Sequence, residues 1–139
     1  MPEDIYIFLK NYGFTKEDLS SFETENEKIY FTNIDEIKKN IGFLLNKELS
    51  KNEIIQVIRK NPFMLTVKNN RLEAINKIYI TDLHFKILEL KKLILSNHDV
   101  YISSPVELNK NIEFLKEHNG SLERIKAFFL KYPYLVSLS

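Results

Sequence analysis

The sequence predicts an all-α fold, a right- or left-handed solenoid of about four helix-turn-helix repeats of roughly 35 residues each. Three observations lead to this prediction. Apolar residues recur at three- and four-residue steps along most of the chain. Glycine and proline, with 3 and 4 copies in 139 residues, are too scarce for the many turns of a β fold. Two segments of the chain also match each other at a fixed offset.

The offset is 71 residues, and it relates residues 33–66 to residues 104–137 without a gap. Identical residues stand at ten of these positions, and a distance of 71 is about twice the length of a two-helix repeat. We therefore expect one repeat between the two segments and one before them. The predicted repeats cover residues 1–32, 33–67, 68–103 and 104–139 and form a single domain, 1–139.

Helix starts are predicted where a side-chain oxygen can accept a hydrogen bond from the first free backbone N–H groups. In the first repeat this signal is Thr15-x-x-Asp18, preceded by Gly13, which can close the preceding helix in a left-handed conformation. The second repeat carries two such signals, Asn33-x-x-Glu36 and Ser50-x-x-Glu53. Each signal predicts a helix that begins one residue later.

Apolar stripes and proline define the rest of the second repeat. Its first helix carries Ile34, Ile37, Ile41, Leu44 and Leu45, and its second carries Ile54, Ile55, Val57 and Ile58. Pro62 prevents the second helix from continuing past Asn61. The apolar tail after this proline, residues 63–65, is expected to fill the core.

The third repeat is the least regular in sequence. Its best helix-start signal is Thr81-Asp82, which comes 31 residues after Ser50 and 40 before Ser121. This repeat has Asn97-His98 near the point where its neighbours have proline. We interpret it as a degenerate repeat with a longer second helix, whose apolar stripe is formed by Leu83, Ile87, Leu90 and Ile94.

The fourth repeat returns to the pattern of the second. Ser104-Pro105 predicts the start of its first helix, with the proline at a favourable first position. Gly120 and Ser121 predict the break and the second start. Pro133 predicts the end of the second helix, followed by an apolar tail at residues 134–136.

Charge is distributed unevenly, although the net charge is only +1. Residues 1–36 hold 3 basic and 9 acidic side chains, residues 37–95 hold 12 and 5, and residues 96–139 hold 5 of each. The middle block is therefore basic, and a basic zone attracts phosphate or acidic partners. The acidic first repeat is interpreted as a solvated cap, with a protein-docking face or a shield for the basic zone as alternatives.

The candidate nucleic-acid-binding residues are the cations of the basic block and their counterparts in the last repeat. They are Lys38, Lys39, Arg59, Lys60, Lys68, Arg71, Lys91, Lys92, Lys110 and Lys131. Lys39 recurs as Lys110 and Lys60 as Lys131, so these charges are expected on one side of a solenoid, as a groove that tracks phosphates requires. The alternative is that lysines near helix ends only solvate the surface and complement the helix dipole.

Other side chains offer weaker candidates. The aromatic residues Tyr30, Phe31, Tyr79, Tyr101 and Tyr134 could stack on bases, but core packing is the favoured interpretation. Three dispersed histidines and no cysteine predict no metal site and no disulfide. The chain has no glycine-rich phosphate loop and no nucleophile elbow, so we expect neither an enzyme, nor a cofactor, nor a small-molecule substrate.

The residue pattern resembles that of the mitochondrial transcription termination factor (mTERF) family. The resemblance is carried by the segments 8–19, 41–54 and 61–65, and it returns in Ile112-x-Phe114-Leu115 and Tyr132-Pro133-Tyr134-Leu135. It covers nearly the whole chain, in spacing more than in rare residues. It implies a curved solenoid whose concave basic face binds nucleic acid in transcription, translation or RNA maturation.

The expected function is thus a non-enzymatic binding module that binds DNA or RNA in a basic groove formed by residues 37–95. The alternative is a protein-protein interaction scaffold. The acidic start at residues 1–4 lacks the features of a targeting signal, and no apolar run reaches the roughly 18 to 20 residues of a membrane span. We therefore expect a cytoplasmic protein, and the abundance of lysine, asparagine and isoleucine is typical of an A/T-rich bacterial genome.

Overall fold

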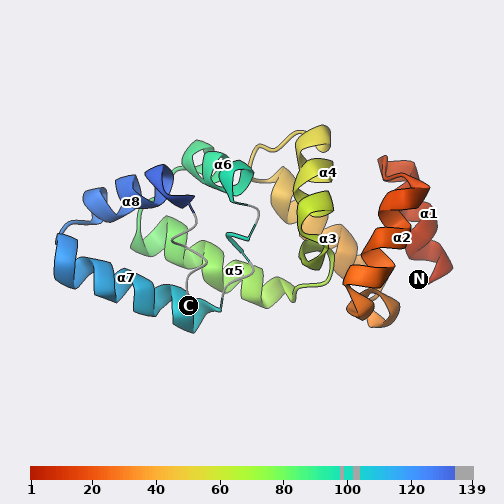
Figure 1. Ribbon diagram of the computed structural model, residues 1–139, viewed down its shortest axis with the longest axis horizontal. Coiled ribbons are helices and arrows are strands. Elements are labelled where there is room, and N and C mark those ends of the chain that lie inside the picture. Colours follow the sequence, from red (N-terminus) through yellow and green to blue (C-terminus); the bar gives the residue numbers. More distant parts are fainter. Residues whose placement is uncertain (98, 102–103, 134–139) are drawn as a thin grey trace. The chain divides into compact units, whose positions relative to one another are not determined.

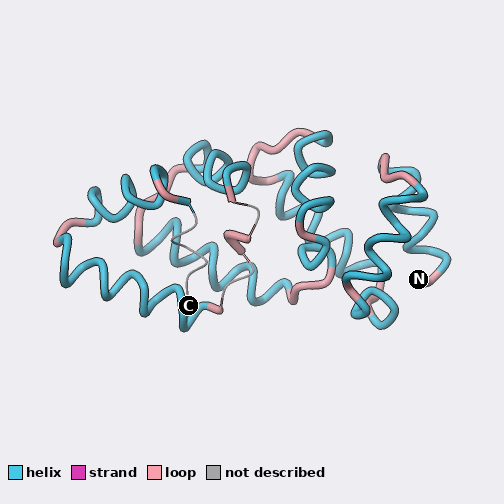
Figure 2. Tube along the Cα trace, in the orientation of Figure 1, coloured by secondary structure: helices cyan, strands magenta, loops and turns pink. Residues whose placement is uncertain are grey.

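The computed structural model describes residues 1–97, 99–101 and 104–133. Within these ranges the chain is helical and contains no strand (Figure 2). It divides into two compact units, residues 1–69 and 70–139. The all-α class is confirmed, whereas the single domain stays a prediction.

Unit 1 contains four α-helices and two short 3₁₀ helices (Figure 1). They are α1 (Glu3–Tyr12), α2 (Lys16–Glu25), η1 (Glu27–Phe31), α3 (Ile34–Leu45), α4 (Lys51–Lys60) and η2 (Pro62–Leu65). Thr15, Asn33 and Ser50 each accept a hydrogen bond from the third residue of the helix that follows, as the sequence predicts. Gly13 ends α1 with a φ of 131°, which a residue with a side chain rarely adopts.

The core of unit 1 lies between these helices, and two buried asparagines join it to η2. Asn26 Nδ2 donates to the Pro62 carbonyl oxygen at 3.2 Å and to Thr66 Oγ1 at 2.8 Å. Asn40 Nδ2 donates to the Leu65 and Val67 carbonyl oxygens at 3.2 and 2.8 Å. Three backbone carbonyls in and just after the 3₁₀ turn thereby gain a side-chain partner.

Unit 2 contains α5 (Asn69–Lys77), a π-helical turn η3 (Ile78–Asp82), α6 (Ile87–Ser96), α7 (Pro105–Asn119) and α8 (Leu122–Lys131). Its core includes Tyr79 and Tyr101, whose ring centroids lie 5.7 Å apart. Tyr79 Oη donates to the Val100 carbonyl oxygen, and Tyr101 Oη donates to Asn76 Oδ1. Both buried hydroxyls are therefore satisfied.

The predicted start of the second helix in the third repeat is wrong. Thr81 and Asp82 lie in η3, which continues α5, and α6 begins only at Ile87. Between them the chain reverses at His84, whose φ is 58°, and Phe85 N donates to the Tyr79 carbonyl oxygen. Lys86 N donates to Glu89 Oε1 at the start of α6, half of the capping pattern that Thr15 and Ser50 make in full.

The predicted apolar stripe of this repeat is right for Leu90 and Ile94, which are buried on α6, and wrong for its first two residues. Leu83 precedes the reversal and does not belong to α6, and Ile87 is exposed. The buried face of α6 consists of Leu90, Leu93 and Ile94, so Leu93 is the member that was not predicted. Leu45 at the end of α3 is also exposed, whereas the predicted stripe of α4 is buried throughout.

The longer second helix predicted for this part of the chain is also wrong, and the spacing of four helices is regular once α6 is placed. The residues that precede α2, α4, α6 and α8 are Thr15, Ser50, Lys86 and Ser121, spaced 35, 36 and 35 residues apart. Each of these four helices has ten residues. The backbone of the residue that follows each helix also agrees, with φ between −126° and −143° and ψ between 74° and 99°.

Candidate nucleic-acid interface

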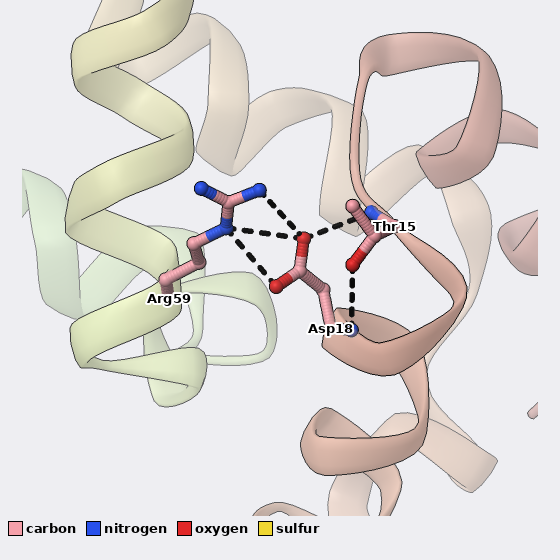
Figure 3. Close-up of polar contacts among 3 residues, drawn as sticks. All are labelled: Thr15, Asp18 and Arg59. Carbon is pink, nitrogen blue, oxygen red and sulfur yellow. Dashed lines mark hydrogen bonds and ion pairs between the residues drawn. The ribbon is translucent and has the colours of Figure 1, made fainter.

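Arg59, one of the predicted phosphate-binding residues, is held in an ion pair. Its guanidinium reaches from the last turn of α4 to Asp18 in the first turn of α2, with Nε and Nη2 within 3.0 to 3.1 Å of the carboxylate (Figure 3). Asp18 also forms both halves of a capping box with Thr15. Such a fork fixes the direction of the guanidinium. Arg59 therefore joins α4 to α2, and its predicted role in binding nucleic acid stays a prediction.

The pKa of the Asp18 carboxyl reflects these contacts. Partial burial by itself would raise this pKa, but the hydrogen bonds from Arg59 and Thr15 outweigh burial and lower the pKa below its ordinary value. The folded state consequently binds fewer protons at this group than the unfolded state does. Its contribution to stability is present above the unfolded pKa of about 4 and is lost as the pH falls through the folded pKa.

We expect the Asp18→Asn variant to be less stable than the parent protein at pH 7, by about 1 kcal/mol because the pair is partly exposed. The difference should shrink as the pH is lowered from about 5 to 3, since the carboxylate then becomes protonated in both states. Urea unfolding at a series of pH values measures this. Glu48→Gln, at an exposed position, is the control. A difference between Asp18→Asn and the parent that stays constant with pH would contradict the assigned role.

Unit 2 contains a related ion pair. Lys126, a buried residue of α8, places Nζ 2.8 Å from Glu89 Oε1 and donates to the His84 carbonyl oxygen at 3.0 Å. Burial works against the charged form of Glu89, but hydrogen bonds from Lys126 and from the Lys86 backbone outweigh it and lower the pKa of Glu89. Glu89 and Asp18 are each the third residue of their helix. In both units a cation from a later second helix thus binds the first turn of an earlier one.

The remaining cations predicted in unit 1 are exposed. Lys38 and Lys39 lie side by side in the sequence of α3, Lys60 ends α4, and Lys68 precedes α5. Lys38 Nζ lies 5.4 Å from the centroid of the Phe8 ring. Lys39, Lys60 and Lys68 form no ion pair with any residue among those described. These charges are therefore presented to solvent.

The cations predicted in unit 2 come from four helices. They are Arg71 on α5, Lys91 and Lys92 on α6, Lys110 on α7 and Lys131 on α8. Lys91 is half-buried and the other four are exposed. Lys110 lies 4.0 Å from Glu107, and Lys131 Nζ lies 5.5 Å from the centroid of the Tyr132 ring. Residues 37–95 belong partly to unit 1 and partly to unit 2. The groove that they are expected to form stays a prediction.

The aromatic candidates divide into two groups. Tyr79 and Tyr101 are buried, as the core interpretation predicts, whereas Tyr30 is half exposed and Phe31 is 91% exposed. Tyr134 lies outside the described residues. Three exposed aromatic residues were not predicted as candidates, namely Phe63 in η2, Phe114 on α7 and Phe128 on α8. Phe63 belongs to the apolar tail that was expected to fill the core, and that expectation is wrong for this residue. Phe114 and Phe128 occupy positions where an apolar stripe would be expected, so periodicity alone predicts them to be core.

The described residues form neither a metal site nor a membrane-spanning helix. No group of three or more histidine, aspartate or glutamate side chains that could hold a metal ion occurs in the described ranges. None of the helices described is long and apolar enough to cross a membrane. His118 stacks on Phe114, with ring centroids 4.3 Å apart, and His98 falls outside the described ranges.

Comparison with known proteins gives the family. The mTERF family model matches residues 7–84, which is more than half of the chain. The chain belongs to the mTERF family. The resemblance noted in the sequence is thereby confirmed, and the match runs from α1 to His84, just before α6.

Two relatives are similar to part of the chain. They are proteins named transcription termination factor 3, mitochondrial, from Mus musculus and Rattus norvegicus. Each is 27% identical over 92 residues, which is 66% of this chain. The chain spans only 22% of the length of either relative.

Proposed function

We propose that this chain is a non-enzymatic helical-repeat module that binds nucleic acid through the basic surface of residues 37–95. The observation that carries the proposal is membership of the mTERF family, a family of nucleic-acid-binding helical-repeat proteins. The exposed lysines of unit 1 support it, because a phosphate backbone is bound by cations that are not already neutralised. The proposal includes both DNA and RNA as ligands.

The proposed architecture is a solenoid of four repeats. Its support is the common length, spacing and end geometry of α2, α4, α6 and α8. A helix pair of this size cannot cover its own apolar stripe, and stacking of successive pairs buries the stripe. A cytoplasmic location and a bacterial origin remain predictions, while the names of the two relatives place those proteins in mitochondria.

Neutralising three exposed lysines of unit 1 tests the proposed function. The variant Lys38→Gln/Lys39→Gln/Lys60→Gln leaves Arg59 in place, because Arg59 holds Asp18. We expect it to bind labelled DNA or RNA at least about tenfold more weakly at low salt, and to reduce the slope of log affinity against log salt concentration by about 2 to 3. Fluorescence anisotropy over a salt series measures both quantities.

The matched control is Lys10→Gln/Lys16→Gln/Lys28→Gln, which removes three exposed lysines from the acidic first block. This control should change affinity much less than the unit 1 variant does. If the two triple variants weaken binding equally, the ligand responds to net charge and the proposed surface is rejected. If the parent protein binds no single- or double-stranded DNA or RNA at low salt, the proposed function is lost.

A protein partner is the second candidate function. It is favoured by α6, which exposes Ile87, Leu88 and Leu95. Exposed aliphatic side chains on one helix are typical of protein interfaces and do not bind phosphate. Absence of nucleic-acid binding together with self-association or capture of a defined protein through α6 would favour this candidate.

A further inference from the structure

The ten-residue helices α2, α4, α6 and α8 can be compared position by position (Figure 1). Three positions separate α8 from the others. The third residue is Asp18, Glu53 and Glu89 in the first three helices and Arg124 in α8. The seventh residue is Phe22, Val57 and Leu93, and then Phe128. The residue that follows the helix is Asn26, Asn61 and Asn97, and then Tyr132.

In α2 and α6 the polar residues at two of these positions bind the next helix pair. The third-residue carboxylates of Asp18 and Glu89 bind Arg59 of α4 and Lys126 of α8. The asparagines that follow α2 and α6 donate from their side-chain amides to a proline carbonyl oxygen just beyond α4 and α8. Asn26 donates to the Pro62 carbonyl oxygen, and Asn97 donates to the Pro133 carbonyl oxygen. The two polar groups therefore recur as a connection from one helix pair to the next, within unit 1 and again within unit 2.

α8 has lost both connecting groups. Arg124 cannot accept a hydrogen bond and would repel an incoming Arg or Lys, and Tyr132 has no amide with which to donate to a proline carbonyl. The seventh residue also differs in exposure, because Phe22, Val57 and Leu93 are at most 4% exposed while Phe128 is 38% exposed. The outer face of α8 is thus not built to hold a further helix pair in the way that α2 and α6 do.

Among the described residues, Arg124 makes no contact that would compensate for these losses. A cation in the first helical turn faces the positive end of the helix dipole, where the other three helices have a carboxylate. Arg124 forms no ion pair with any part of the chain that is described. Since none of the residues that the structure describes neutralises this guanidinium, the charge is available to a ligand.

The outer face of α8 forms a shallow hollow of about 330 Å³. Its lining residues are related by three- and four-residue steps and so form one stripe; they are Arg124, Ala127, Phe128, Lys131 and Tyr132. The rings of Phe128 and Tyr132 lie 5.3 Å apart between centroids. Arg124 stands at one end of the stripe and Lys131 near the other, seven positions later in the helix, which is a rise of about 10 Å.

We propose that this face, the α8 platform, binds an unpaired segment of nucleic acid. The exposed face of Phe128, with Tyr132 beside it, stacks on a base, and Arg124 and Lys131 bind the phosphates on either side. Aromatic rings flanked by cations are the combination that single strands require, whereas bases in a duplex are already stacked on each other. The proposal rests on the proposed function and names its ligand as single-stranded.

Two paired variants test the α8 platform. Phe128→Leu/Tyr132→Leu removes the aromatic faces, and leucine already occupies the seventh position in α6. Arg124→Gln/Lys131→Gln removes the charges. The probe is a short oligothymidylate that carries one 2-aminopurine, whose fluorescence is quenched by stacking, and a duplex of the same length is compared. Thermal melting first establishes that each variant is folded.

We expect the parent protein to quench the 2-aminopurine. The leucine variant should lose quenching and bind the single strand about 5- to 100-fold more weakly with an unchanged salt slope. The glutamine variant should reduce the single-strand salt slope by about 1.4. The control Phe114→Leu/Lys116→Gln, on the exposed face of α7, should behave as the parent does. If the leucine variant does not fold, Phe128→Leu alone takes its place.

The outcomes separate this proposal from the proposed function. If the parent binds the single strand and both variants bind and quench as the parent does, the α8 platform is rejected and the proposed function stands. If only the glutamine variant weakens binding, and weakens single strand and duplex alike without quenching in the parent, the face binds phosphate without stacking and the proposal is overturned. If the parent binds no nucleic acid at low salt, both fail together.

Discussion

Replacing Tyr79 with alanine is expected to lower the free energy of unfolding by about 3 to 5 kcal/mol. Tyr79 is fully buried in unit 2, and its ring makes edge contacts with Phe85 and Tyr101 at centroid distances of 5.6 and 5.7 Å. Truncation leaves a cavity in place of the ring and removes the donor to the Val100 carbonyl oxygen. It also removes the ring against which Phe85 packs, whereas the backbone hydrogen bond from Phe85 N–H to the carbonyl oxygen of residue 79 remains.

Tyr79→Phe separates the ring from the hydroxyl in this experiment. Burial raises the pKa of Tyr79 well above its ordinary value, so its hydroxyl remains a donor at physiological pH. Removing the hydroxyl should cost only about 1 to 2 kcal/mol. Tyr30→Ala, at a half-exposed tyrosine of η1, is the matched control for loss of a tyrosine side chain. Urea unfolding gives each value, and a Tyr79→Ala cost no larger than that of Tyr30→Ala would contradict the assigned packing.

Replacing Asn40 with alanine should have the second largest effect, a loss of about 2 to 4 kcal/mol. Asn40 is 1% exposed, and its amide is a shared donor to the carbonyl oxygens of Leu65 and Val67. Without it these carbonyls keep no partner from α3, and the segment after η2 is no longer fixed. The cost is the desolvation of polar groups that have lost their hydrogen bonds.

Two further variants make this prediction specific to the amide donor. Asn40→Asp keeps the size of the side chain, but it replaces the donor with a buried carboxylate that faces two carbonyl oxygens, and it should be at least as destabilising. Asn46→Ala removes an exposed asparagine just after the same helix and should change stability by less than about 0.5 kcal/mol. Thermal unfolding of all three variants measures the order. A stable Asn40→Asp protein would show that the amide does not hold η2.

The helix starts could be predicted because their signals are local. Thr15, Asn33 and Ser50 act on a residue three positions away, so the interaction depends on sequence spacing alone. The same reasoning failed to predict the second helix of the third repeat. Its second helix begins after Lys86, which has no side-chain acceptor, and Thr81-Asp82 offered a better signal in the wrong place. The reversal at His84 depends on a bond to Tyr79 and a positive φ, neither of which a helix-start pattern encodes.

Only the charge of the candidate surface could be predicted from the sequence. Composition identified the exposed lysines of the basic block, but it could not distinguish Lys60 from its neighbour Arg59, which is held by a carboxylate 41 residues away. The α8 platform was not predicted, since the apolar periodicity predicts that Phe128 is a core residue. A signal for it was nevertheless present, because Arg124 and Tyr132 break a series of three carboxylates and three asparagines that becomes evident once α6 is in register.

By itself the sequence determined the all-α class, the family resemblance, most helix starts and the location of the basic block. These properties depend on residues a few positions apart or on composition, which folding does not alter. The tertiary structure alone decided where α6 begins, that Arg59 and Lys126 join successive second helices, and that Phe128 is exposed while its counterparts are buried. Each of these depends on which distant segments of the chain pack together, and a repeat spacing does not specify that.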